Sequence, residues 1–229
     1  MGYQLPRIQK GIRKRGRLVR VALVRRRLDS YHQAKTMKET GPGSESAPLL
    51  REKSRLMSSS EIERTLVRLA HEIVEKNNGA DDLLLVGIQR RGVPLARRLA
   101  KLLETIENKP IDVGTLDIRS YRDDLSSRGP RPAVNPDALG FDGNGRDVVL
   151  VDDVLYTGRT IRAALDALVD HGRPRRVQLL VLIDRGHREL PIEAAFVGRR
   201  IQTTEREVIE VKLEEVDDNE QVLLMERID

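Results

Sequence analysis

Two adjacent aspartates carry the strongest chemical signal in this sequence. Asp152 and Asp153 directly follow Val148–Val151, a continuous apolar run that predicts a strand buried on both faces. Carboxylates at the carboxyl end of such a strand point into a ligand crevice instead of the core. Paired there, they suit ribose hydroxyls or a magnesium ion. We expect both residues to be catalytic and to bind magnesium directly or indirectly.

The turn after the aspartates has the residues that a phosphate needs. Thr157, Gly158, Arg159 and Thr160 open a predicted helix, and the free amides and positive dipole end of a helix favour an anion. Gly158 lets the backbone approach that anion. Strand, carboxylates and phosphate turn in this order match a ribose 5-phosphate. The alternative, an ordinary strand, turn and capped helix, would not require two adjacent carboxylates.

Four segments of the chain resemble known proteins. Val148–Thr160, VVLVDDVLYTGRT, resembles the phosphoribosyl pyrophosphate loop of type I phosphoribosyltransferases. Three others resemble the PyrR family, whose members are both pyrimidine operon regulators and uracil phosphoribosyltransferases: LDIRSYRDDL, HGRPRRVQLLVLIDRGHRELP and RTLVRLAHEIVEKN. This resemblance runs from about Leu50 to the C-terminus. It implies a pentosyltransferase that makes UMP and pyrophosphate from uracil and phosphoribosyl pyrophosphate, with Mg²⁺ as cofactor.

The resemblance also assigns residues to substrate binding. In type I enzymes the turn after the first core strand binds pyrophosphate, and here Arg90 and Arg91 occupy that turn. Which of these two arginines contacts pyrophosphate is open. Arg122 is the natural pyrophosphate clamp and the third catalytic candidate. The expected substrate-binding residues are Arg90, Arg91, Tyr121, Val154, Leu155, Tyr156, Thr157, Gly158, Arg159, Thr160, Asp184, Arg185, Gly186 and His187.

A long segment, Arg119–Arg146, is rich in Asp, Gly, Pro, Ser and Asn. In a compact domain a loop of this length is usually a functional lid or a disordered segment. Tyr121 and Arg122 stand where the family's flexible loop begins. As a lid, the segment would exclude water while a positive ribosyl centre develops and pyrophosphate leaves. The alternative is a plain surface loop.

The resemblance places Asp184–Glu189 in the nucleobase pocket, after another apolar run. This pocket lacks a nearby aromatic residue, and purine-using relatives generally stack the base on one, so a small pyrimidine is favoured. His187 is interpreted as a hydrogen-bonded structural histidine rather than a catalytic acid. No general base is assigned, because departure of pyrophosphate needs charge neutralisation more than proton removal.

RNA binding is a second class of function. PyrR proteins of some lineages bind a stem-loop in pyrimidine-operon mRNA through a basic face of the dimer, with UMP or UTP as regulatory ligand. Against this, residues 58–229 hold 26 Lys or Arg and 32 Asp or Glu, and Val67 occupies a family position that is often polar. The candidate RNA-binding residues are Arg68, His71, Arg173, Arg175 and Arg176.

Further alternatives stay open. The chain could be an RNA-binding regulator with little enzymatic activity, or a phosphoribosyltransferase for a purine base or orotate. Turnover with each base separates these readings. The family also implies a homodimer or a higher homo-oligomer.

The charge distribution divides the chain in two. The net charge is +5, but ten basic residues and no acidic residue fall within residues 1–28, so residues 29–229 carry −5. Residues 1–48 are expected to be a disordered basic extension, a nucleic-acid-binding arm, or the result of a start codon placed too far upstream, with Met37 and Met57 as alternative starts. Residues 49–229 form the expected phosphoribosyltransferase domain.

Composition also bounds the setting. The chain has no cysteine, which excludes disulfides and thiolate nucleophiles. No apolar run approaches the ~20 residues that a membrane span needs. We therefore expect a cytoplasmic protein without a membrane partner.

Strands and helices alternate along the chain, which predicts a mainly parallel sheet flanked by helices, an α/β fold. Ser60 and Glu63 form an expected capping box before a helix with its apolar stripe from Ile62 to Ile73. The type I phosphoribosyltransferase fold implied by the resemblance adds a small hood of short strands. The other expected elements are strands at 83–88, 111–118, 148–151, 177–183, 195–199, 208–212 and 222–226, and helices from Pro94 and over 160–171.

Overall fold

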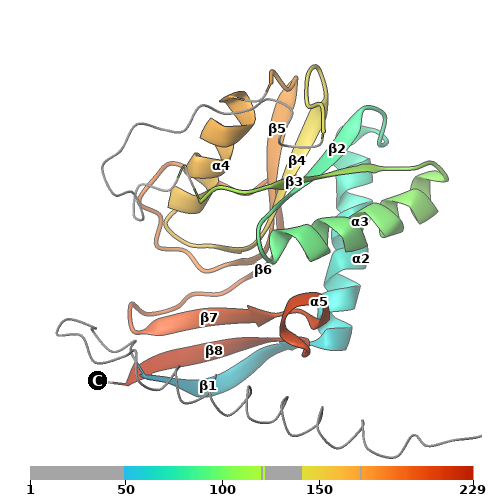
Figure 1. Cartoon of the computed structure of the whole chain (residues 1–229). Helices are drawn as coiled ribbons and strands as arrows, with labels where there is room; N and C mark the ends of the chain where they lie inside the picture. Colours follow the sequence, from blue (N-terminus) through green and yellow to red (C-terminus); the bar gives the residue numbers. More distant parts are fainter. Residues whose placement is uncertain (1–48, 120, 122–140, 171, 229) are drawn as a thin grey trace, which may run out of the picture. The chain divides into compact units, whose positions relative to one another are not determined.

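The computed structural model describes residues 49–119, 121, 141–170 and 172–228. Its centre is a five-stranded sheet in the order β3-β2-β4-β5-β6, and every neighbouring pair is parallel (Figure 1). The predicted parallel sheet is confirmed. Its strands are β2 (Leu83–Ile88), β3 (Asp112–Leu116), β4 (Asp147–Leu155), β5 (Arg176–Asp184) and β6 (Phe196–Arg200).

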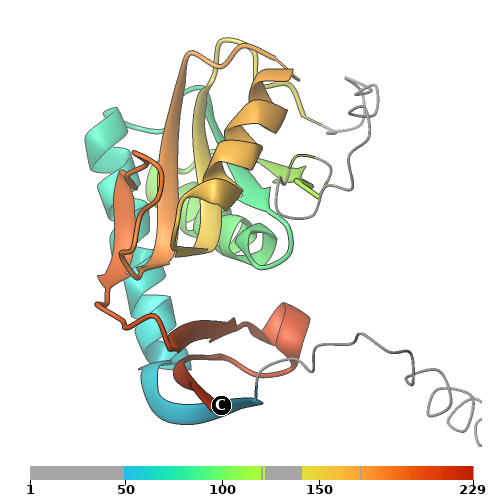
Figure 2. The same ribbon diagram turned by 90° about the vertical axis from the view of Figure 1, so that its left-hand side faces the viewer.

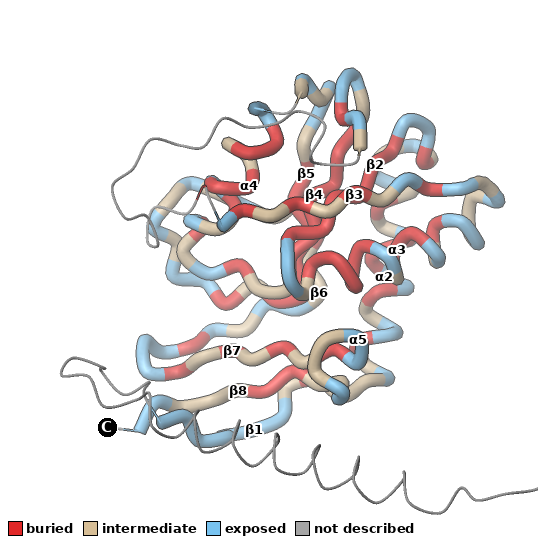
Figure 3. Tube along the Cα trace, in the orientation of Figure 1, coloured by how far each residue is buried: buried red, intermediate tan, exposed pale blue. Residues whose placement is uncertain are grey.

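Helices cover both faces of this sheet (Figure 2). Successive side chains of a strand point to opposite faces, so Leu85 and Val149 join the core under α2 (Ser59–Asn77) and α3 (Gly92–Glu107). Their neighbours Leu84 and Val148 join a second core under α4 (Arg159–Asp170). Burial on both faces explains why β2 is apolar throughout (Figure 3).

A second, antiparallel sheet forms the hood, in the order β1-β8-β7. It consists of β1 (Leu49–Ser58), β7 (Glu207–Lys212) and β8 (Gln221–Ile228), with the short helix α5 (Glu214–Asp217) between the last two strands. β1 pairs along its length with β8, from Leu49 opposite Ile228 to Ser58 opposite Gln221. The hood of short strands is confirmed, and a chain beginning at Met57 would lack most of β1.

The capping box lies two residues before the predicted one. Ser58 is the N-cap of α2, and its backbone amide donates to Glu61 Oε2 at 2.8 Å. Both Ser58–Glu61 and Ser60–Glu63 have the required spacing, but pairing of β1 with β8 continues to Ser58 and fixes where the helix begins. The predicted box at Ser60 was therefore wrong.

β4 is longer than predicted and carries the aspartates within the strand. Leu155 pairs with Asp184 at the end of β5, so the ladder continues past Asp152 and Asp153. Most of the predicted lid, including Arg122, lies outside the described residues, as do residues 1–48. Within the described parts, no helix has the length and hydropathy to cross a membrane.

Candidate functional site

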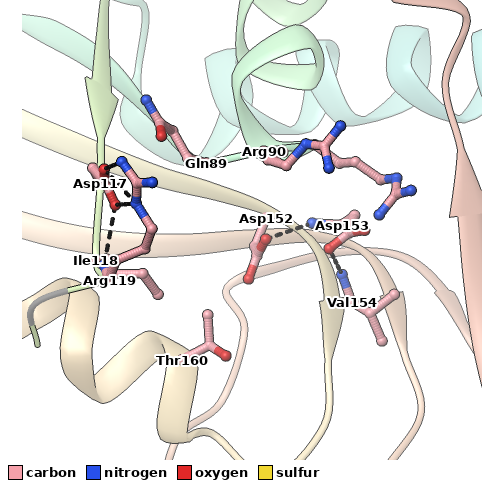
Figure 4. A pocket seen from close by; sticks show the side chains of 10 residues that line it. Gln89, Arg90, Asp117, Ile118, Arg119, Asp152, Asp153, Val154 and Thr160 are labelled. Atoms are coloured by element: carbon pink, nitrogen blue, oxygen red, sulfur yellow. Dashed lines mark hydrogen bonds and ion pairs between the residues drawn. The ribbon is translucent and has the colours of Figure 1, made fainter. Parts of the chain in front are cut away.

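The two aspartates lie within the last four residues of the central strand β4, and not directly after the strand as predicted. Asp152 is 6% exposed, and its Oδ1 accepts the backbone amide of Asp153 at 2.9 Å. Asp153 Oδ1 accepts the amide of Val154 at 2.9 Å (Figure 4). Burial raises the pKa of Asp153, and the charge of Arg91 acts in the opposite direction. Backbone amides thus hold both carboxylates near the carboxyl ends of the parallel strands.

A cavity of about 480 Å³ opens above these carboxylates. It joins the turn after β2, the residues after β3, the end of β4 and the start of α4, so four elements meet at one edge of the sheet (Figure 4). The lining is mostly polar and carries both signs of charge, which suits a phosphorylated sugar. Its residues are Gln89, Arg90, Arg91, Asp117, Ile118, Arg119, Asp152, Asp153, Val154 and Thr160.

Two charged lining residues, Asp117 and Arg119, were not among the predicted site residues. They pair with each other, Arg119 Nη2 to Asp117 Oδ2 at 2.5 Å, and this hydrogen bond lowers the pKa of Asp117. Asp117 directly follows β3. The rule that ligands bind at carboxyl ends of parallel strands would have found Asp117.

The two arginines of the turn after β2 differ in their surroundings. Arg90 is exposed and lines the cavity. Arg91 reaches the hood, where its Nη2 and Nε donate to the two carboxylate oxygens of Asp217 at 2.7 and 3.0 Å. This pairing raises the pKa of Arg91. The guanidinium of Arg91 is therefore engaged with the hood, while Arg90 remains at the cavity.

The glycine of the predicted phosphate turn has a left-handed backbone conformation. Gly158 has φ +93°, a value that L side chains rarely adopt. The carbonyl of Thr157 accepts the amide of Glu189 at 3.0 Å, and Arg159 Nη2 pairs with the Glu189 carboxylate at 2.6 Å. Of the residues from Leu155 to Thr160, only Thr160 lines the cavity, and the side chain of Leu155 is buried in the core under α4.

An aromatic ring does stand beside the predicted nucleobase segment. Arg185 lies over the ring of Tyr156, 4.0 Å from its centroid, and the His187 ring meets Tyr156 edge-on at 5.9 Å. The expectation of no nearby aromatic was wrong, because parallel pairing of β4 and β5 brings these distant residues together. One face of Tyr156 is nevertheless covered by the guanidinium.

Arg185 and His187 are both held by the segment that leads from β6 into β7 of the hood. Arg185 is buried and donates to Thr203 Oγ1 at 3.1 Å and to the carbonyl of Glu207 at 2.6 Å. His187 Nε2 is 2.5 Å from the carbonyl oxygen of Thr203. These contacts agree with the interpretation of His187 as a hydrogen-bonded structural histidine.

Asp184 and Gly186 line a second cavity, of about 360 Å³, and not the first. Arg188 organises this loop: it donates to Asp184 Oδ1 at 2.5 Å and to the carbonyls of Tyr156 and Ile192 at 2.7 and 3.0 Å. The segment predicted to bind the nucleobase therefore divides between this second cavity and the stack on Tyr156.

The candidate RNA-binding residues are exposed, but several are engaged in ion pairs. Arg175 and Arg176 both contact the buried carboxylate of Asp147, at 3.0 and 2.6 Å. Arg68 pairs with Glu72 at 3.0 Å. It also donates to the carbonyls of two β6 residues at 3.0 and 2.8 Å. His71 is exposed on α2, and Arg173 is exposed in the segment before β5.

The carboxylates fit one kind of magnesium site. Among the described residues, no group of three or more His, Asp or Glu side chains could hold a metal ion. Mg²⁺ usually binds through one or two carboxylates together with substrate phosphates and water. Asp152 and Asp153 beside the cavity match that arrangement.

Of Tyr121 and Arg122, which were expected at the start of the lid, the structure describes only Tyr121. It is 8% exposed and packs in the core under α4. This placement fixes the point where the chain leaves the core, but it puts the ring of Tyr121 among apolar residues and not among those lining the cavity.

Comparison with known proteins gives the family. Residues 54–216 match the family model described as "Phosphoribosyl transferase domain". "Bifunctional protein PyrR" of Thermus thermophilus is 57% identical over 178 residues, which are 78% of this chain and 98% of that protein. The protein of the same name from Clostridium novyi is 50% identical over 175 residues, covering 76% and 98%.

Solved structures support the same fold. A hypoxanthine phosphoribosyltransferase from Staphylococcus aureus has a TM-score of 0.57 at 20% identity, covering 75% of this chain and 92% of that chain. One from Trypanosoma cruzi has a TM-score of 0.58 at 17% identity, covering 76% and 91%. At 20% and 17% identity these structures show a shared fold alone. The two PyrR proteins are 57% and 50% identical to this chain and therefore show the family. The chain belongs to the PyrR family of phosphoribosyltransferase-domain proteins.

Proposed function

We propose that this protein is a uracil phosphoribosyltransferase that makes UMP and pyrophosphate from uracil and phosphoribosyl pyrophosphate. The observation that carries the proposal is the position of Asp152 and Asp153, between a cationic turn and the start of α4 in one cavity. Membership of the PyrR family supports the same activity.

The residues of the chain would divide the substrate between them. The free amides at the start of α4, with Thr160, would hold the 5-phosphate. Asp152 and Asp153 would hold the ribose hydroxyls, and Arg90 would offset the charge of the departing pyrophosphate. Mg²⁺ bound to the pyrophosphate, with the two aspartates as direct or indirect ligands, would neutralise further charge. Arg122 would act as the clamp.

The stack of Arg185 on Tyr156 supports a small base. A purine that needs an aromatic platform would compete with the guanidinium for the ring, and Arg185 is held in place by Thr203 and Glu207. A pyrimidine recognised by its polar edges does not need that ring face. This favours uracil over hypoxanthine or guanine.

Turnover assays test the substrate directly. The full chain should convert uracil to UMP, and hypoxanthine, guanine and orotate should give little product. Formation of another nucleotide without UMP would refute the substrate assignment. A chain shortened to begin before Leu49 keeps all of β1 and tests whether residues 1–48 contribute to activity.

The second proposed function is regulation of pyrimidine-operon mRNA by attenuation. It rests on the family and on the exposed side chains of Arg68, His71 and Arg173. Binding of leader RNA should respond to UMP or UTP and weaken with salt. A filter-binding assay at two salt concentrations checks both. Absence of binding, or binding that salt does not affect, would refute the RNA-binding proposal and leave only the proposed enzymatic activity.

The proposal also includes assembly and location. We infer a homodimer or a higher homo-oligomer in the cytoplasm, as expected for the family. Light scattering on the purified full chain measures the assembly state, and a monomer at all concentrations would contradict it.

A further inference from the structure

We propose that Asp217, in the hood helix α5, is a positioning residue for phosphoribosyl pyrophosphate: it holds Arg91 and thereby the turn that would bind pyrophosphate. This inference rests on the proposed function for the identity of the ligand. Asp217 itself does not line the cavity above the aspartates.

The contact between the two residues is specific in geometry. Both carboxylate oxygens of Asp217 are used, at 2.7 and 3.0 Å from two nitrogens of Arg91. The side chains are 17% and 30% exposed, so solvent screens this pair only partly. A bidentate pair fixes direction as well as distance. Asp217 Oδ2 also accepts the backbone amide of Leu213 at 3.0 Å, which fixes the carboxylate within the hood.

The turn has no free space on its opposite side. A Cβ at Gly92 would lie 2.2 Å from the carbonyl oxygen of Val151, so the backbone there packs directly against β4. A Cβ at Gly87 would lie 2.7 Å from the carbonyl oxygen of Gly92, so β2 also packs directly against the start of α3. The residue before Asp152 is therefore in contact with the turn. The turn is confined by β4 on one side and by the hood carboxylate on the other.

This confinement separates the roles of the two arginines. Arg90 faces the cavity and is available to the pyrophosphate. Arg91 also lines the cavity, but its guanidinium is committed to Asp217, and the charges of Asp153 and Glu210 attract it further. Asp217 therefore orients the turn through Arg91, and the turn presents Arg90 and its backbone amides to the ligand.

A second pairing in the same region supplies a matched control. Arg98, about two helical turns along α3 from Arg91, donates to both oxygens of Glu215 in α5 at 2.8 and 2.7 Å, and it also contacts Glu220. Removing the Glu215 charge leaves Arg98 with Glu220. Glu215→Gln and Asp217→Asn thus remove the same charge from the same short helix, and only Asp217→Asn releases the turn.

The experiment compares full-length wild type, Asp217→Asn, Asp217→Glu and Glu215→Gln. Steady-state kinetics with uracil and phosphoribosyl pyrophosphate are combined with calorimetric titration of phosphoribosyl pyrophosphate in magnesium buffer. For Asp217→Asn, KM and Kd for phosphoribosyl pyrophosphate should rise about tenfold, with kcat and the KM for uracil changed by less than about twofold. Asp217→Glu should recover part of the affinity, and Glu215→Gln should match wild type.

The direction of the change is decisive. If Arg91 bound pyrophosphate directly, Asp217→Asn would free it, and phosphoribosyl pyrophosphate would bind equally well or more tightly; that result overturns the inference. Equal losses in Asp217→Asn and Glu215→Gln also overturn it. Should Asp217→Asn fail to fold, Asp217→Glu must still show a smaller rise in Kd, and an unchanged or lower Kd in that variant overturns the inference.

The two proposals fail separately. If wild type makes no UMP but Asp217→Asn binds phosphoribosyl pyrophosphate about tenfold more weakly, the positioning role stands and the uracil assignment falls. If wild type makes UMP and Asp217→Asn has unchanged constants, the assignment stands and the positioning role falls.

Discussion

Strand β4 carries aspartates at both ends, and their surroundings are opposite. At its start, Asp147 is buried and its two oxygens contact Arg175 and Arg176. At its end, Asp152 and Asp153 accept backbone amides and line a cavity of about 480 Å³. All three aspartates lie in the same strand, β4. Paired with two arginines, Asp147 has a structural environment, whereas Asp152 and Asp153 lie where a ligand in the cavity could reach them.

Substitution at the end of β4 should have the largest effect. Asp153→Asn, and separately Asp152→Asn, should each lower kcat/KM about a hundredfold or more. Each substitution removes a negative charge that faces the substrate in the cavity. Stability should change little, since the amide oxygen can still accept the backbone N–H. Steady-state kinetics and urea denaturation check the two statements. Normal turnover would remove the aspartate from the site.

Substitution at the start of β4 should show the reverse behaviour. Asp147→Ala should lower the free energy of unfolding by about 1–2 kcal/mol, a moderate value because Arg175 and Arg176 are 54% and 44% exposed. Hydrogen bonds from these arginines lower the pKa of Asp147. The kcat should stay near that of wild type when measured well below the melting temperature. A large loss of kcat in a folded variant would contradict the contrast between the two ends.

A third buried carboxylate extends the comparison to the hood. The hydrogen bond from Lys53 lowers the pKa of Glu207 from 4.5 to about 2. The charged Glu207 stabilises the folded protein fully at pH values above its unfolded-state pKa of 4.5. This contribution is lost as the pH falls from 4.5 through the folded-state pKa of about 2. Glu207→Gln should therefore be less stable than wild type at neutral pH, and the gap should close toward pH 2. Urea denaturation along this pH series measures it; a constant gap would assign the effect to packing.

The smallest effect concerns the arginines themselves. Arg173→Gln should reduce the slope of log K against log salt for leader RNA by about one. Arg176→Gln should reduce it by less, because Arg176 is already neutralised in part by Asp147. Filter binding across a salt series compares them. Equal reductions would show that the Asp147 pair opens when RNA binds.

The local signals in the sequence were sufficient to predict the parallel sheet. β2 was predicted with its observed bounds because a strand buried on both faces leaves a continuous apolar run. Asp152 and Asp153 were predicted as site residues because they follow an apolar run, and both line the cavity near that end of β4. β1 was missed because most of its side chains are exposed, and its position depends on pairing with β8 at the far end of the chain.

Contacts between distant residues explain what the sequence did not show at the site. Arg91 and Asp217 are 126 residues apart, and no spacing rule connects them. The Tyr156 and Arg185 stack depends on the register of β4 and β5. Asp117 was missed because the strand before it was predicted to run to Ile118, whereas β3 ends at Leu116 and leaves Asp117 directly after the strand.

The pairing of β1 with β8 determines when the molecule can be completed during synthesis. Among the described strands, β1 pairs only with β8, whereas every strand of the parallel sheet has its partners once Arg200 has been made. A nascent chain can therefore assemble the sheet that carries the aspartates while β1 waits for its partner to leave the ribosome. Asp217 also emerges late, so a ribosome-bound chain lacking its last residues would have the carboxylates in place but no fixed turn beside them.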